Sequence, residues 1–131
     1  MKKNDLEKSL VSEWMNSAAS DFALAKKGKV STKVQYYSLC FHAQQAAEKA
    51  IKAVLLFHKI TFPKTHNIEH LLKLLKNANI NVPKVISKAQ PDDIESLQEI
   101  DMKEYKSAVA IAEKVLKWAS LIIFKQPDKL F

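Results

Sequence analysis

Three polar side chains in one helix-forming segment have the spacing needed to act together. His42, Gln45 and Lys49 stand at positions i, i+3 and i+7, so a helix places them on one face. A His and a Gln facing a groove between helices could bind a base edge or a phosphate, with Lys49 supplying charge. The structural alternative makes His42 and Gln45 hydrogen-bonded groups at a helix–helix or dimer interface, as buried polar groups normally are.

A second candidate group lies in a loop before a short helix. Lys64, Thr65 and His66 precede a segment that begins at Ile68. Helix N-termini carry unpaired N–H groups and favour anions, so a phosphate could bind there with Lys64 and His66 beside it. In the structural alternative, Thr65 or Asn67 caps the helix and His66 hydrogen-bonds to backbone across the loop.

The sequence offers little for metal or covalent chemistry. His66 and His70 are four residues apart, but no third ligand is fixed beside them, so we expect no metal. Cys40 is the only cysteine, which excludes an intramolecular disulfide. No Ser-His-Asp or Cys-His arrangement is evident, and we assign no catalytic residue and no cofactor.

The charge of the chain favours diffuse attraction to polyanions. Its net charge is +7 at pH 7 over 131 residues, and every basic residue is lysine. Lysine is a point charge, whereas arginine grips phosphate in two places, so geometry-specific phosphate recognition is disfavoured. The alternative is a lysine-rich surface that keeps the protein soluble. No signal peptide and no apolar run long enough to cross a bilayer is present, so we expect a cytoplasmic protein without membrane contact.

Apolar periodicity predicts an all-α fold. Helices are expected from about Asp5 to Lys27, from after Thr32 to about His58, from about Ile68 to Asn77 and from about Met102 to Phe124. A turn around Val82, Val85 and Ile86 and a short helix from Asp92 to Ile100 are also predicted. We therefore expect an up-and-down antiparallel bundle of three long helices plus one or two short ones, as a single domain over 1–131 with a core at about 5–124.

Local signals place the helix ends and the buried faces. Thr32 with Gln35, and Asp101 with Glu104, have capping-box spacing, Asn67 is a good N-cap and Gly28 suits a C-cap. The expected buried stripes are Leu10, Trp14, Ala18, Phe22 and Ala25 in the first helix, Leu39, Ala43, Ala46, Ala50 and Val54 in the second, and Tyr105, Val109, Ala112, Leu116, Ala119 and Ile123 in the last.

Two stretches resemble a known family. Residues 40–53, CFHAQQAAEKAIKA, resemble the signature helix of the HEPN (higher eukaryote and prokaryote nucleotide-binding) family, and residues 62–72, FPKTHNIEHLL, resemble its short loop and helix start. Trp14, Ala18, Asp21, Phe22 and Ala25 match its usual first helix, and residues 108–119 look like its last one.

The resemblance implies a helical bundle that commonly dimerises. It also implies association with nucleotides or RNA, a minimal nucleotidyltransferase partner and a toxin–antitoxin or defence pair. Branches of the family that cleave RNA use an Arg and a His separated by four to six residues. This chain has no Arg and no His after His70, so that site is absent in its usual form. The segment between Pro83 and Asp101 is also shorter than in relatives, which often carry another helix there.

Three functions are therefore compatible with the sequence. The first is an interaction module that homodimerises and binds a nucleotide, RNA or a nucleotidyltransferase. The second is a metal-independent ribonuclease or toxin that uses His42 or His66 as an acid–base group. The third is a purely structural dimer. The lack of Arg and of a catalytic set favours the first.

Overall fold

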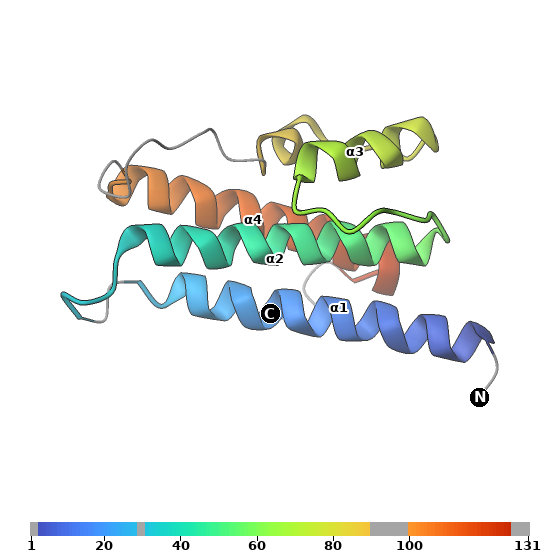
Figure 1. The fold of residues 1–131 in the computed structure, drawn as a ribbon, viewed down its shortest axis with the longest axis horizontal. Helices are drawn as coiled ribbons and strands as arrows, with labels where there is room; N and C mark the ends of the chain where they lie inside the picture. Colours follow the sequence, from blue (N-terminus) through green and yellow to red (C-terminus); the bar gives the residue numbers. More distant parts are fainter. Residues whose placement is uncertain (1–2, 29–30, 90–99, 127–131) are drawn as a thin grey trace.

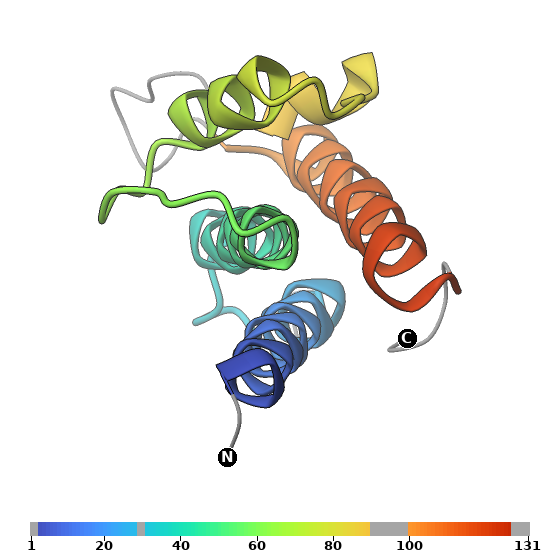
Figure 2. The same cartoon turned by 90° about the vertical axis from the view of Figure 1, so that its right-hand side faces the viewer.

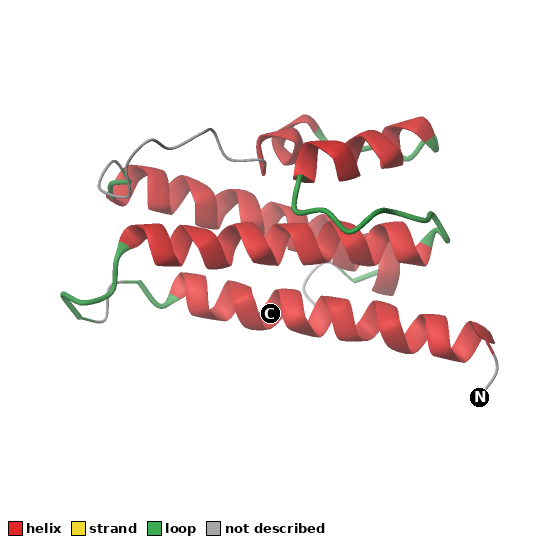
Figure 3. Cartoon of the chain, in the orientation of Figure 1, coloured by secondary structure: helices red, strands yellow, loops and turns green. Residues whose placement is uncertain are grey.

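The structure, a computed structural model, describes residues 3–28, 31–89 and 100–126. The described residues form α1 (Lys3–Lys26), α2 (Tyr36–Phe57), α3 (Ile68–Asn77), the 3-10 helix η1 (Lys84–Ala89) and α4 (Met102–Phe124), and none of them lies in a strand (Figure 3). The prediction of an all-α bundle with three long helices is confirmed. The short helix expected from Asp92 to Ile100 lies almost wholly outside the described residues.

The three long helices pack against one another, and α3 with η1 forms a layer over α2 and α4 (Figures 1 and 2). α1 is antiparallel to both other long helices. α2 and α4 point the same way, so among the long helices the expected antiparallel packing holds for α1 with α2 and for α1 with α4 (Figure 1). The rings of Tyr36 and Tyr105, near the two helix starts, accordingly lie 5.4 Å apart.

α2 is the central helix, and its small side chains explain its position. Its predicted stripe of Leu39, Ala43, Ala46, Ala50 and Val54 is buried throughout. Alanines on the contact face allow neighbouring helix axes to approach closely. α2 therefore contacts α1, α3 and α4.

In α1, the predicted buried stripe starts one residue too early. Val11 and Met15 are buried there, in line with Ala18, Phe22 and Ala25. Leu10 is 38% exposed, so its assignment to the core was wrong, because Val11 occupies the corresponding position of the stripe. In α4, Ala112, Leu116 and Ala119 are buried as predicted, whereas Tyr105, Val109 and Ile123 are half-buried.

Most helix ends follow the local signals. The side chains of Asn67 and Asp101 accept hydrogen bonds from the backbone N–H groups of His70 and Glu104. Gly28 follows α1 with φ +74°, a conformation that glycine adopts without strain. The Thr32–Gln35 capping box is wrong: α2 begins at Tyr36, and its N-cap Gln35 makes no side-chain cap bond. A turn closed by the Val34 N–H and the Ser31 carbonyl takes its place.

No helix in the described part of the chain is long and apolar enough to span a bilayer.

Candidate functional site

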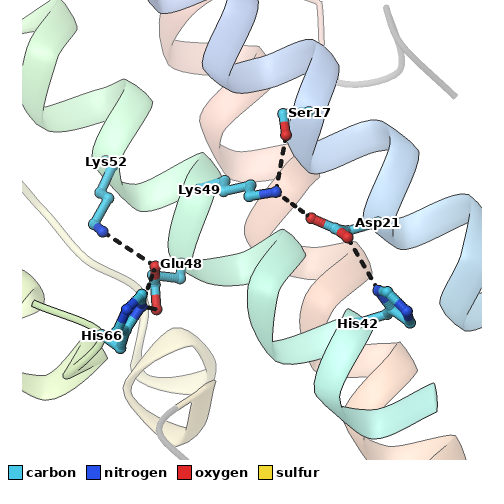
Figure 4. A network of polar contacts seen from close by, with 7 residues as sticks. All are labelled: Ser17, Asp21, His42, Glu48, Lys49, Lys52 and His66. Carbon is cyan, nitrogen blue, oxygen red and sulfur yellow. Dashed lines mark hydrogen bonds and ion pairs between the residues drawn. The ribbon is translucent and has the colours of Figure 1, made fainter. Parts of the chain in front are cut away.

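His42 and Lys49 meet on one carboxylate, that of Asp21 in α1 (Figure 4). The Asp21 Oδ1 atom lies 3.1 Å from Nδ1 of His42, and Oδ2 accepts a hydrogen bond of 2.6 Å from Nζ of Lys49. Lys49 also donates to the Ser17 hydroxyl at 2.9 Å. Asp21 is buried, so these contacts satisfy an acid that would be costly to bury alone.

Helix geometry explains this cluster. Ser17 and Asp21 are one turn apart in α1, while His42 and Lys49 are two turns apart in the antiparallel α2. The predicted common face of His42 and Lys49 is therefore confirmed, and that face points at α1. Gln45 lies between them in sequence and is half-buried, but its side chain makes no hydrogen bond to any described residue.

A second cluster surrounds Glu48 (Figure 4). The Glu48 carboxylate is bound by Nζ of Lys52 at 3.1 Å and lies 3.1 Å from Nδ1 of His66. Glu48 and Lys52 are both buried, and the ammonium of Lys52 lies over the rings of Trp14 and Phe62 at 5.5 and 6.0 Å. A buried ion pair with two aromatic rings beside it thus lies where the segment after α2 crosses that helix.

The loop residues behave mainly as the structural alternative predicts. Thr65 Oγ1 accepts a hydrogen bond from the Asn67 N–H, and Asn67 caps α3. The expected bond from His66 to backbone is wrong, because His66 binds the Glu48 side chain instead. Lys64 is exposed and joins neither cluster.

The six predicted residues therefore do not converge on one site. His42 and Lys49 lie on the α1 side of α2, whereas His66 lies on the side covered by the loop and α3 (Figure 4). Sequence reasoning did not identify Asp21 or Glu48 as the groups that bind these histidines. The i, i+4 spacing of Glu48 and Lys52 was a usable signal for the second cluster.

Both histidines have the same chemical arrangement. A carboxylate at Nδ1 favours the tautomer in which Nδ1 carries the hydrogen, leaving Nε2 as the acceptor of the neutral ring. The His66 side chain is 82% exposed, so its Nε2 atom is accessible to a ligand in solution. The His42 side chain is 35% exposed.

Cys40, in α2, is half-buried. Burial, with a smaller contribution from Glu104, raises the pKa of the Cys40 thiol, which disfavours a reactive thiolate. Within the described ranges, no group of three His, Cys, Asp or Glu side chains is placed to hold a metal ion.

Comparison with known proteins gives one family. The sequence profile of the HEPN domain matches residues 11–123. A crystal structure of an archaeal HEPN homologue superposes with a TM-score of 0.68 at 26% sequence identity, covering 86% of this chain and 97% of that one. No curated protein matches significantly. The profile covers most of the chain and the archaeal structure shares its fold, so the chain belongs to the HEPN domain family.

Proposed function

We propose that the chain is an interaction module of the cytoplasm: a HEPN homodimer that docks on a minimal nucleotidyltransferase and associates with nucleotide or RNA. The two proteins would form a toxin–antitoxin or defence pair. Membership of the HEPN family supports a function of this kind.

The proposal depends on the observation that candidate polar side chains are already bound to other side chains of the protein. His42 and Lys49 are both bound to Asp21, and the Asp21 carboxylate receives its partners from a neighbouring helix. These contacts hold α1 to α2. This arrangement favours a scaffold that presents surfaces over a catalytic cleft, in agreement with the lack of any Arg.

Exposed leucines on α1 support a protein partner or a second copy. Leu6 and Leu10 are 52% and 38% exposed and lie one helical turn apart. Apolar side chains grouped on one face of a helix are typical of interaction surfaces. Lys64, Thr65 and His66 remain the candidates for phosphate contact, because Lys64 and His66 are exposed beside the start of α3.

Co-expression tests the partner. We expect the neighbouring gene to encode a minimal nucleotidyltransferase; that protein should co-purify with this chain, and the complex should have a defined mass in light scattering. Replacing Leu6 and Leu10 with Glu should abolish the complex or the homodimer. Leu121→Glu, at a site of α4 that is 53% exposed, serves as the matched control. A monomer that captures no nucleotidyltransferase would overturn the proposal, and a dimer without partner or ligand would leave only a structural role.

One observation favours the ribonuclease alternative. A buried carboxylate that orients an exposed imidazole, as Glu48 does for His66, is a common form of general base. RNA incubated with the protein in the presence of EDTA should then be cleaved, and His66→Ala should lose that cleavage whereas His42→Ala should retain most of it. Intact RNA with wild-type protein would exclude this alternative.

A further inference from the structure

A groove opens at the end of the bundle where α1 begins and where α2 and α4 end (Figure 1). Its volume is about 480 Å³. Pockets that bind small molecules typically have volumes of about 300 to 1,000 Å³. Neither carboxylate cluster contributes a residue to this groove, so it is separate from the candidate site described above.

The part of the groove formed by α2 and α4 is apolar. The last turn of α2 contributes Leu56 and Phe57, and the last turn of α4 contributes Ile123 and Phe124. Val11 of α1, which is buried, completes this apolar lining. Phe57 is 41% exposed, so part of the lining still faces water. An apolar chain that covered it would remove this area from water, which favours binding.

The part of the groove formed by α1 is polar and carries an excess positive charge. The Glu7 carboxylate lies 3.9 Å from the Lys59 ammonium, so these two charges balance each other. Lys8 and Ser12 lie one turn apart, and neither side chain has a hydrogen-bond or ion-pair partner among the described residues. The helix dipoles act in the same direction, because α1 begins at this end whereas α2 and α4 end here. An anionic group is therefore favoured on the α1 side.

We infer that this groove binds the anion of a fatty acid, with its chain against Phe57 and Phe124 and its carboxylate at Lys8 and Ser12. An amphiphile of this kind has one apolar end and one anionic end, as the two sides of the groove require. Charge complementarity selects a single carboxylate, because Lys8 supplies one positive charge that Glu7 does not balance. Leu6 and Leu10 do not line the groove, so the inference is independent of the partner docking proposed above.

Isothermal titration calorimetry of the full chain with dodecanoate, below the concentration at which it forms micelles, should show saturable binding. Decanoate should bind about tenfold more weakly, since it buries two fewer methylene groups. Dodecyltrimethylammonium has the same chain length and the opposite charge, so it should also bind about tenfold more weakly than dodecanoate. Equal affinities for the anion and the cation would overturn the inference, as would the absence of dodecanoate binding.

Substitutions test the two sides of the groove separately. Lys8→Gln should weaken dodecanoate binding by about threefold, whereas Lys26→Gln, at the other end of the same helix, should leave it unchanged. Phe57→Ala should weaken it by about fivefold. Phe41→Ala is the matched control, because Phe41 is 49% exposed near the opposite end of α2. Equal affinity of wild type, Lys8→Gln and Phe57→Ala would overturn the inference.

Ser12→Phe should fill the groove and abolish binding, and circular dichroism verifies that this variant is folded. Light scattering on the same samples distinguishes a ligand site from a contact between copies of the chain. A wild-type dimer that Ser12→Phe dissociates would make the groove a protein interface and overturn the inference. An unchanged mass together with lost dodecanoate binding is the result expected for a fatty-acid site.

Discussion

The Glu48 carboxylate, 3% exposed, lies 3.1 Å from Nδ1 of His66, whose side chain is 82% exposed. A buried acid and a surface imidazole are thus joined across the segment that follows α2. The Lys52 ammonium, at 3.1 Å, is the ion-pair partner of the same carboxylate. The carboxylate therefore connects a buried ion pair to the molecular surface.

Glu48→Gln should destabilise the protein strongly. The substitution leaves the buried Lys52 without a counter-charge, and removing one partner of a buried ion pair costs about 3 kcal/mol or more. Urea denaturation measures the change in the free energy of unfolding. Glu113→Gln is the control, because its i, i+4 pair with Lys117 is 46% and 45% exposed and should contribute less than about 0.5 kcal/mol. Equal effects of the two substitutions would contradict the assignment of a buried pair.

Asp21 and Lys49 should show energetic coupling. Their contact of 2.6 Å joins α1 to α2, and groups in direct contact typically couple by about 0.5 to 3 kcal/mol. A double-mutant cycle with Asp21→Asn and Lys49→Met gives that value from the free energies of unfolding. The same cycle between Asp21 and Lys117 should give a coupling near zero. Additive effects of Asp21→Asn and Lys49→Met would show that the pair contributes nothing to stability.

Tyr105→Phe should change how stability depends on alkaline pH. The Tyr105 hydroxyl donates a hydrogen bond to the Ala25 carbonyl, and burial is the main cause that raises the pKa of Tyr105 above 10.0. The folded state therefore favours the neutral phenol. Its stabilisation is complete below the pKa of the unfolded chain and is lost as pH rises through the folded pKa.

The measurement compares urea midpoints of wild type and Tyr105→Phe near neutrality and above pH 10.0, the ordinary pKa. Near neutrality the variant should be less stable by about 1 kcal/mol, and the difference should shrink at alkaline pH. Tyr37→Phe is the control, because Tyr37 lies at the surface. A constant difference at all pH values would mean that the hydroxyl does not titrate as described.

Ala50→Leu should disturb the packing of α2. Ala50 is fully buried in the stripe that faces the other long helices, and added volume in a packed core costs about 1 to 3 kcal/mol. Ala110→Leu, at an exposed position of α4, should be nearly neutral. Thermal unfolding distinguishes the two variants. An unchanged midpoint in Ala50→Leu would show that the alanine face leaves room between the helices.

The sequence predicted those features that depend on local spacing. Asn67 and Asp101 cap their helices through groups three residues away, and His42 and Lys49 share a face because both lie in α2. The carboxylates that bind the histidines were not predicted as partners. Asp21 reaches His42 only through the relative register of α1 and α2, and Glu48 meets His66 only because the segment before α3 crosses it. Neither relationship leaves a pattern in one stretch of sequence.

The central position of α2 has a consequence for the order in which the molecule opens. Amide hydrogens in the middle of this helix, around Ala46 to Val54, are covered on several sides at once by α1, α3 and α4. Their exchange with deuterium should require the whole bundle to come apart, so their rates report the global free energy of unfolding. The first turns of the same helix, at Tyr37 and Phe41, should exchange sooner through local fraying. One helix thus contains both the slowest and some of the faster amides of the protein.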